Sequence, residues 1–225
     1  MIKACIFDLD GTLLDTLKSI RFFLNKTLDE FGIPNISEEQ TKVFVGDGAL
    51  KLVRRAMRAG GIDTESLEGK SESYTIYEKF SRDYNENPYY LTQPYEGIPE
   101  AVSALRSRGI KLAIISNKPK PTVVQLVERH FPGTFDIVEG AVANVPLKPD
   151  PTALFSICTS LGVAPDETAY FGDTSTDMKT AKNYGAGISV GVLWGFRGEE
   201  ELRSNGADIT VASPSEITEI EALNR

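Results

Sequence analysis

Short apolar runs recur along the chain, and segments with helical periodicity separate most of them. The first run covers residues 2–7, and similar runs follow at 111–116, 135–139, 168–171 and 188–192. Continuous apolar runs of this length are typical of strands that are buried on both faces. Strands that alternate with helices build parallel sheets with right-handed crossovers. The pattern therefore predicts an α/β fold in which helices flank a parallel sheet.

Proline and glycine residues mark where the intervening helices begin and end. Pro99 begins a run that ends at Gly109, Pro151 begins one that ends at Gly162, and Gly185 follows a third. Proline is favoured in the first turn of a helix and glycine just beyond its last turn. These positions support helices between the predicted strands.

A long segment after the first strand interrupts the alternation of strands and helices. Residues 16–92 carry apolar side chains at helical spacing, among them Ile20 and Phe23, and no strand pattern. We therefore expect residues 1–15 and 93–225 to form the α/β core and residues 16–92 to form an inserted helical cap subdomain.

Charge and composition narrow the classes of partner. The chain has 24 Lys and Arg against 32 Asp and Glu, a net charge of -8, which repels phosphate polymers and argues against nucleic acid as a partner. No stretch approaches the roughly 20 apolar residues that span a bilayer, so we expect no membrane contact. The N-terminal residues lack the pattern of a secretory signal, which favours a cytoplasmic protein. We expect a monomer or a homodimer.

The strongest chemical pattern is the segment Asp8-Leu9-Asp10-Gly11-Thr12 at the carboxyl end of the first strand. Open parallel sheets bind ligands at this edge. Asp8 and Asp10 lie two residues apart, and Gly11 permits a sharp turn after them. Two adjacent carboxylates repel each other unless a cation compensates, and hard oxygen ligands favour Mg²⁺. The structural alternative is a pair of turn-forming aspartates.

With this segment and three later motifs, the sequence resembles the phosphatases of the haloacid dehalogenase superfamily. Their first motif is Asp-x-Asp-x-Thr, and their later motifs are a Ser or Thr that ends the second core strand, a lysine, and an acidic motif after another strand. The matching positions in this chain are Asp8, Asp10 and Thr12, then Ser116-Asn117-Lys118, Lys148-Pro149 and Gly172-Asp173-Thr174-Ser175-Thr176-Asp177.

The resemblance covers essentially the whole chain, and it implies a Rossmann-like core. Its strands would follow the order third, second, first, fourth, fifth, which brings the strand ends at Asp8, Ser116 and Asp173 side by side. It also implies a reaction in two displacements. Asp8 attacks phosphorus to give an aspartyl phosphate, and Asp10 protonates the leaving alcohol and then deprotonates the attacking water.

Further roles follow from the same resemblance. Lys148 would act beside Asp8 as a catalytic and phosphate-binding cation, and Asp177 would support it by orienting Lys148 or a water at the metal. The remaining assignments are phosphate binding by Thr12, Ser116 and Asn117, and metal binding by Asp8, Asp10 and Asp173. Structural alternatives exist for three of these residues: a turn former at Ser116, a solvated loop lysine at Lys148 and a helix cap at Asp173.

Substrate choice is less constrained than the reaction. Residues 44–53 and 195–198 resemble the phosphoglycolate phosphatase branch, which makes a small phosphorylated metabolite the expected partner. Basic residues recur at helical spacing from residue 51 onward. This basic stripe could meet a substrate carboxylate or be a solvated helix face, and its members are Lys51, Arg54, Arg55 and Arg58.

Two other functions stay open. A phosphohexose mutase of the same fold keeps the equivalent of Asp10, so isomerase chemistry is compatible with the motifs. A non-catalytic receiver module would use Asp8 only as a phosphorylation or metal site. The inserted cap and Lys148 argue against a receiver, because a receiver has no need to exclude water from a substrate.

Overall fold

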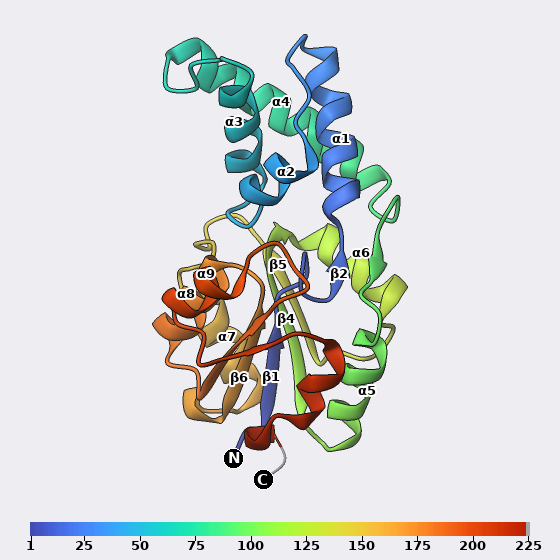
Figure 1. The fold of residues 1–225 in the computed structure, drawn as a ribbon, viewed down its shortest axis with the longest axis vertical. Coiled ribbons are helices and arrows are strands. Elements are labelled where there is room, and N and C mark those ends of the chain that lie inside the picture. Colours follow the sequence, from blue (N-terminus) through green and yellow to red (C-terminus); the bar gives the residue numbers. More distant parts are fainter. Residues whose placement is uncertain (224–225) are drawn as a thin grey trace. The chain divides into compact units, whose positions relative to one another are not determined.

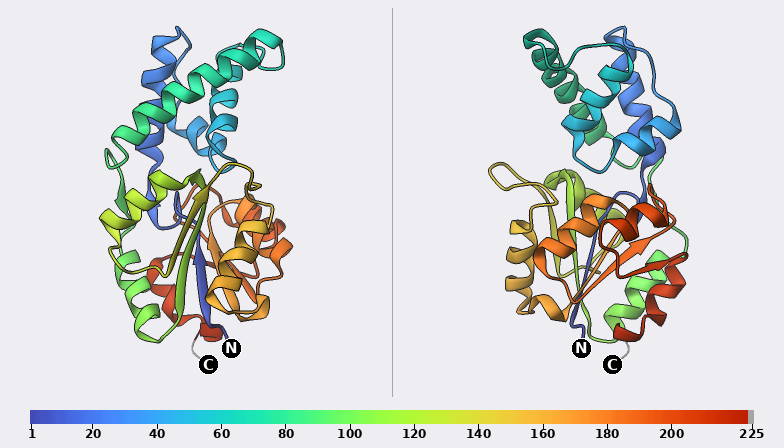
Figure 2. Two further views of the ribbon diagram at one scale, coloured as in Figure 1. Left: turned by 180° about the vertical axis from the view of Figure 1, so that it is seen from behind. Right: turned by 60° about the vertical axis from the view of Figure 1, so that its left-hand side comes forward.

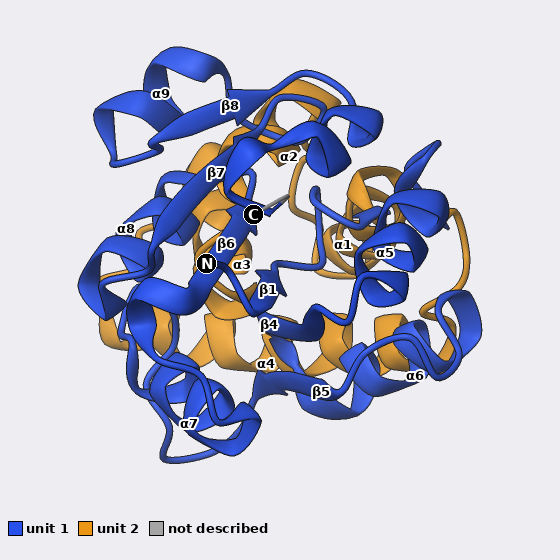
Figure 3. Cartoon of the chain, turned by 90° about the horizontal axis from the view of Figure 1, so that it is seen from below, with its two compact units in different colours: residues 1–15, 93–225 blue, residues 16–92 orange. Residues whose placement is uncertain are grey.

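The structure is a computed structural model, and it describes residues 1–223. The chain divides into two compact units, which Figure 3 colours separately. The core unit comprises residues 1–15 and the chain from residue 93 onward, and the helical unit comprises residues 16–92. Each unit is described by itself.

A six-stranded parallel sheet forms the centre of the core unit (Figure 1). Its strand order is β5-β4-β1-β6-β7-β8, and Figure 3 labels all six strands. Its strands are β1 Ala4–Phe7, β4 Lys111–Pro119, β5 Ile137–Ala141, β6 Thr168–Gly172, β7 Ile188–Val192 and β8 Ile209–Val211. Five of these strands, β1, β4, β5, β6 and β7, match the predicted apolar runs and the predicted strand order. The predicted α/β fold class is confirmed.

Helices cover both faces of this sheet. Figure 3 shows α5 and α6 on one side of the strands and α7 and α8 on the other. The helices of the core unit are α5 Ile98–Ser107, α6 Lys120–His130, α7 Thr152–Leu161, α8 Ser175–Tyr184 and α9 Glu199–Ser204. Three short 3-10 helices complete it: η1 Pro165–Glu167, η2 Pro214–Glu219 and η3 Glu221–Leu223.

The alternation of side chains along β1 builds two apolar layers. Cys5 and Phe7 belong to the layer beneath α5 and α6, whereas Ala4 and Ile6 belong to the layer beneath α7 and α8. All four side chains are fully buried, as expected of a central strand covered on both faces. Phe7 also stacks on Phe171 of β6, with ring centroids 4.6 Å apart. These contacts fix β1, the strand that precedes the Asp8 motif.

Three features of the sheet differ from the sequence prediction. β8 is an additional sixth strand, and its three residues are too few to produce a recognisable apolar run. β4 continues past Ser116 to Pro119, after a register shift against β5 that begins beyond Ile115. A second, two-stranded antiparallel sheet pairs β2 Leu14–Asp15 with β3 Gln93–Pro94, where the chain leaves and re-enters the core unit.

The helical unit consists of four helices, which the two views of Figure 2 show from different sides. They are α1 Leu17–Glu30, α2 Glu38–Phe44, α3 Ala49–Ala59 and α4 Leu67–Glu86. α2 begins with a capping box in which Ser37 and Gln40 satisfy each other's backbone N–H groups. Phe23 of α1 packs edge-on against Tyr84 of α4. Within residues 1–223, no helix combines the length and apolarity needed to cross a bilayer.

Substitutions of two neighbouring residues of α7 should differ in their effect on the free energy of unfolding. Leu154 is fully buried in the apolar layer beneath α7 and α8, whereas the side chain of Phe155 on the same helix is 47% exposed. We expect Leu154→Ala to lower the free energy of unfolding by about 2–5 kcal/mol through a cavity, and Phe155→Ala to lower it by about 1 kcal/mol. Urea denaturation followed by circular dichroism measures both. Equal losses would contradict this description of the core.

Candidate active site

The register of the central strands brings the motif residues to one edge of the sheet. Phe7 of β1 pairs with Ile114 of β4 and with Phe171 of β6. Asp8 lies one residue after Phe7, Ser116 lies two residues after Ile114, and Asp173 lies two residues after Phe171. The three motif residues therefore lie at the same edge of the sheet. The carboxyl ends of three adjacent parallel strands form the site, as is usual for open α/β sheets.

A buried lysine joins two of the aspartates. The Nζ atom of Lys148 lies 2.7 Å from Oδ1 of Asp8 and 2.6 Å from Oδ1 of Asp177. Burial opposes the charge of Lys148, but Asp177 and Asp8 outweigh burial and raise its pKa well above the ordinary value. Lys148 is therefore a fixed cation beside Asp8 rather than a solvated loop lysine.

Asp177 is held by hydrogen bonds to both of its carboxylate oxygens. Oδ1 accepts from Lys148 and from the hydroxyl of Tyr170, which lies 3.2 Å away. Oδ2 accepts from the backbone N–H of Thr174 at 3.1 Å and from its hydroxyl at 2.6 Å. A Cβ atom on Gly172 would lie 2.3 Å from Cβ of Asp177, so glycine is required there. These four donors leave Asp177 suited to anchoring Lys148.

Asp173 accepts hydrogen bonds from neutral groups. The hydroxyl of Thr12 donates to Oδ1 at 3.1 Å, and the backbone N–H of Phe196 donates to Oδ2 at 2.8 Å. Burial raises the pKa of Asp173 well above its ordinary value, and the nearby carboxylates of Asp177 and Asp8 add to the effect. In this arrangement the hydrogen of the Thr12 hydroxyl goes to Asp173, and phosphate binding by Thr12 stays a prediction.

The carboxylates of Asp8, Asp173 and Asp177 form a buried cluster, in which one ligand atom from each lies within 4.8 Å of the others. Burial raises the pKa of Asp8 to about 7 despite the opposing effect of Lys148. When all three carboxylates are ionised, the single charge of Lys148, which contacts Asp8 and Asp177, leaves the cluster with excess negative charge. A divalent cation with a preference for oxygen ligands fits this cluster.

Asp10 lies outside that cluster and has a cation of its own. The Nζ atom of Lys118 donates to Oδ1 of Asp10 at 2.8 Å and to Oδ2 at 3.0 Å. Gly11 turns the chain directly after Asp10, with a φ of 88°, and its N–H bonds to the carbonyl of Leu14. The role of Asp10 as a metal ligand stays a prediction. Lys118 was not among the predicted site residues.

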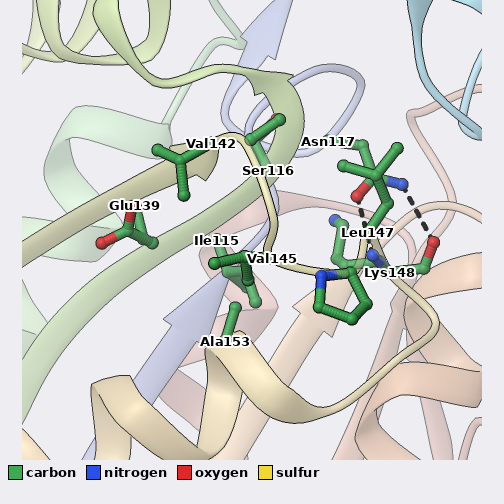
Figure 4. A pocket seen from close by; sticks show the side chains of 12 residues that line it. Ile115, Ser116, Asn117, Glu139, Val142, Val145, Leu147, Lys148 and Ala153 are labelled. Carbon is green, nitrogen blue, oxygen red and sulfur yellow. Dashed lines mark hydrogen bonds between the residues drawn. The ribbon is translucent and has the colours of Figure 1, made fainter.

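Asn117 contacts the backbone of Lys148 with both ends of its amide. Its Oδ1 accepts from the N–H of Lys148 at 2.8 Å, and its Nδ2 donates to the carbonyl of Lys148 at 3.1 Å (Figure 4). Ser116 is buried, and its Oγ accepts from the N–H of Lys118 at 3.2 Å. Asn117 thereby fixes the loop that carries Lys148. Phosphate binding by Ser116 and Asn117 stays a prediction.

The loop after β7 contributes contacts that the sequence did not reveal. Nε1 of Trp194 donates to the backbone carbonyl of Thr12 at 3.0 Å, and Phe196 donates to Asp173 as described. A Cβ atom on Gly195 would lie 2.3 Å from Cβ of Asp173 and 2.5 Å from the carbonyl of Gly11. The loop therefore packs directly on two motifs. Trp194 also packs against the apolar layer beneath α5 and α6.

The arginines of the basic stripe on α3 make contacts within the helical unit. Arg55 contacts Asp47 at 2.5 Å and the carbonyl of Phe44 at 2.7 Å. Arg54 donates to Ser73, and Arg58 donates to the backbone carbonyl of Arg54. These arginines therefore support the helical unit itself. The contacts offer no support for the stripe as a carboxylate-binding surface.

Comparison with known proteins gives matches over most of the chain. The model of the haloacid dehalogenase-like hydrolase family matches residues 5–191. A phosphoglycolate phosphatase of Aquifex aeolicus is 31% identical, with 97% of this chain and 96% of the relative covered. Another phosphoglycolate phosphatase, from Rhodospirillum rubrum, is 36% identical, with 92% of this chain and 86% of the relative covered.

Solved structures agree with these relatives. A provisionally named phosphoglycolate phosphatase of Lactobacillus delbrueckii subsp. bulgaricus is 34% identical and has a TM-score of 0.89, with coverage of 96% of this chain and 97% of the other. A provisionally named beta-phosphoglucomutase of Thermotoga maritima is 26% identical, with a TM-score of 0.70 and coverage of 97% and 98%. The chain belongs to the haloacid dehalogenase-like hydrolase family, and it is a phosphoric monoester hydrolase.

Proposed function

We propose that this enzyme is a magnesium-dependent phosphatase that hydrolyses a small phosphomonoester, with phosphoglycolate as the first candidate, through an aspartyl phosphate on Asp8. The observation that carries the proposal is the buried contact of 2.7 Å between Lys148 and Asp8. A nucleophilic carboxylate and a phosphoryl group are both anionic, so a fixed cation beside them lowers their repulsion.

In the first step, an oxygen of Asp8 attacks phosphorus while the bond from phosphorus to the leaving oxygen breaks. Asp10 gives its proton to that oxygen, and the alcohol leaves. In the second step, Asp10 takes a proton from water as the water oxygen attacks phosphorus and the bond to Asp8 breaks. Lys148, which Asp177 and Asn117 hold in place, stays beside the phosphoryl group throughout.

Asp8 and Asp173 are the residues that would hold Mg²⁺, together with Asp10 as predicted from the family motif. Asp177 shares the cluster, but its oxygens already accept from four donors. When bound, Mg²⁺ supplies positive charge that stabilises the transferring phosphoryl group. Thr12 and Phe196 orient the carboxylate of Asp173.

Ser116, Asn117 and Thr12 are the proposed contacts for the phosphate oxygens. Ser116 lies at the same edge of the sheet as Asp8, because β4 pairs with β1 in register. The amide of Asn117 has two N–H groups, and it donates from Nδ2 to the carbonyl of Lys148 at the same edge of the sheet. Thr12 follows Gly11 in the turn after Asp10, where its backbone N–H bonds to the carbonyl of Leu9 at 3.3 Å, and its assignment to phosphate rests on the family motif.

The choice of phosphoglycolate rests on the relatives in Aquifex aeolicus and Rhodospirillum rubrum, which match 97% and 92% of this chain. A phosphate-release screen over phosphoglycolate, sugar phosphates, nucleotides and pyrophosphate, with and without Mg²⁺, tests it. Release from phosphoglycolate well above the other compounds supports the proposal. Isomerised sugar phosphate without net phosphate release would favour a mutase instead.

Removal of the nucleophile gives the most direct activity prediction. We expect Asp8→Asn to lower phosphate release on the order of 10⁴-fold or more, because an amide cannot form the aspartyl phosphate. Asp166→Asn, at an exposed position of the core unit, is the matched control and should keep wild-type activity. Equal release by wild type and Asp8→Asn with Mg²⁺ present would overturn the mechanism.

The loop after β7 offers a pair of glycine substitutions. We expect Gly195→Ala to weaken Mg²⁺ activation roughly 10- to 100-fold, because its Cβ would displace Asp173. At Gly198 of the same loop a Cβ would meet no atom within 4 Å, so Gly198→Ala should stay within about twofold of wild type. Mg²⁺ titrations of phosphate release measure both variants. Equal behaviour of the two would contradict the assignment of Asp173.

Metal binding should stabilise the enzyme in a pH-dependent way. The pKa of Asp8 is raised to about 7 and that of Asp173 well above its ordinary value, so protons compete with Mg²⁺ at pH 6 more than at pH 8. Saturating Mg²⁺ should raise the Tm on the order of 5 °C at pH 8 and distinctly less at pH 6. Differential scanning fluorimetry measures the shift, and Asp173→Asn should abolish it. An undiminished shift in Asp173→Asn would argue for another metal site.

A further inference from the structure

The part-buried ion pair between Lys118 and Asp10 has no role in the steps described above. One ammonium group contacts both oxygens of one carboxylate, at 2.8 and 3.0 Å. The side chain of Lys118 is only 7% exposed and that of Asp10 is 19% exposed. A lysine side chain loses both hydration and rotamer freedom in such a place, so the ion pair is a specific feature rather than a surface contact.

The local fold is built to place this lysine. β4 shifts register against β5 after Ile115 and continues to Pro119, so Lys118 lies on the extension of the strand beside β1. A Cβ atom on Gly140 of β5 would lie 2.8 Å from the carbonyl of Lys118 and 2.6 Å from Cα of Lys120. Glycine at position 140 therefore allows the backbone of β4 to approach β5 where Lys118 is placed.

The two lysines of the site serve different carboxylates. Lys148 contacts Asp8 and Asp177, and Lys118 contacts Asp10. Lys118 contacts both carboxylate oxygens of Asp10. This double contact restrains rotation of the Asp10 carboxylate. When one oxygen carries the transferable proton, the other can still accept from Lys118. The restraint therefore persists in both protonation states of Asp10.

We propose that Lys118 is a positioning residue for proton transfer: it holds the carboxyl group of Asp10 in the orientation from which Asp10 protonates the leaving oxygen and then deprotonates water. The inference rests on the proposed function of Asp10. Lys118 keeps its own proton in both steps, and the bonds that form and break are those of Asp8, phosphorus, the alcohol and water. A misplaced acid slows only the reactions that need it.

Substrates with different leaving groups separate this role from a structural one. Release of the alkoxide of phosphoglycolate needs a proton, whereas p-nitrophenolate and acetate leave without one. Rapid-quench and stopped-flow measurements on Lys118→Met give the rates of the first step for phosphoglycolate, p-nitrophenyl phosphate and acetyl phosphate. Lys120→Met is the matched control, because Lys120 lies two residues away, its side chain is 41% exposed and it pairs with Glu139 rather than with an aspartate of the site. Lys118→Arg tests rescue by another cation.

We expect Lys118→Met to slow the first step with phosphoglycolate about 100-fold, with the KM within about threefold of wild type. The first step with p-nitrophenyl phosphate and acetyl phosphate should stay within about threefold, which also shows that the variant is folded. Lys118→Arg should recover part of the lost rate, and Lys120→Met should behave as wild type.

Two results would overturn the inference. An equal loss on all three substrates would assign Lys118 to the structure or to the phosphate group, and a raised KM for phosphoglycolate alone would assign it to the substrate carboxylate. Failure of the proposed function has a different signature. In that case wild-type enzyme would form no phosphoenzyme from any of the three compounds, and the basis for a role of Lys118 would fall with it.

Discussion

The ammonium of Lys148 lies between the carboxylates of Asp8 and Asp177, and all three groups are buried. Removal of Lys148 would leave two buried carboxylates without a cation, and breaking a buried ion pair in this way typically costs about 3–5 kcal/mol. Three segments that are distant in sequence must therefore stay in contact: the end of β1, the loop before α7 and the start of α8. The other contacts of the site hold these three segments so that Lys148 stays between Asp8 and Asp177.

Close backbone approaches at two glycines and hydrogen bonds from Asn117 keep Lys148 in contact with Asp8 and Asp177. Gly172 lets Asp177 lie directly against the end of β6, and Gly195 lets the loop after β7 pack on Asp173. Asn117 binds the peptide N–H and carbonyl of Lys148, which fixes the origin of its long side chain. The order of strands in the sheet comes first, because only with β1 between β4 and β6 do these groups meet.

The sequence predicted those parts of the fold that depend on long, regular patterns. Five buried runs and a family resemblance gave the fold class and the order of five strands, whereas β8 has too few residues to show a pattern. Lys118 could not be recognised in the same way. Its importance arises from a register shift and from Gly140 on another strand, and a single lysine after Asn117 carries no sign of either. The hydroxyl of Thr12 likewise has a partner, Asp173, that only the folded chain reveals.

The central claim is that Asp8 becomes phosphorylated during turnover. Rapid acid quenching of the enzyme with phosphoglycolate and Mg²⁺, followed by borohydride reduction and peptide mass spectrometry, tests this claim directly. Borohydride converts an acyl phosphate of aspartate into homoserine, so the account predicts homoserine at position 8 and at no other aspartate. Phosphate release without modification at position 8, or modification at Asp10 or Asp173 instead, would contradict it.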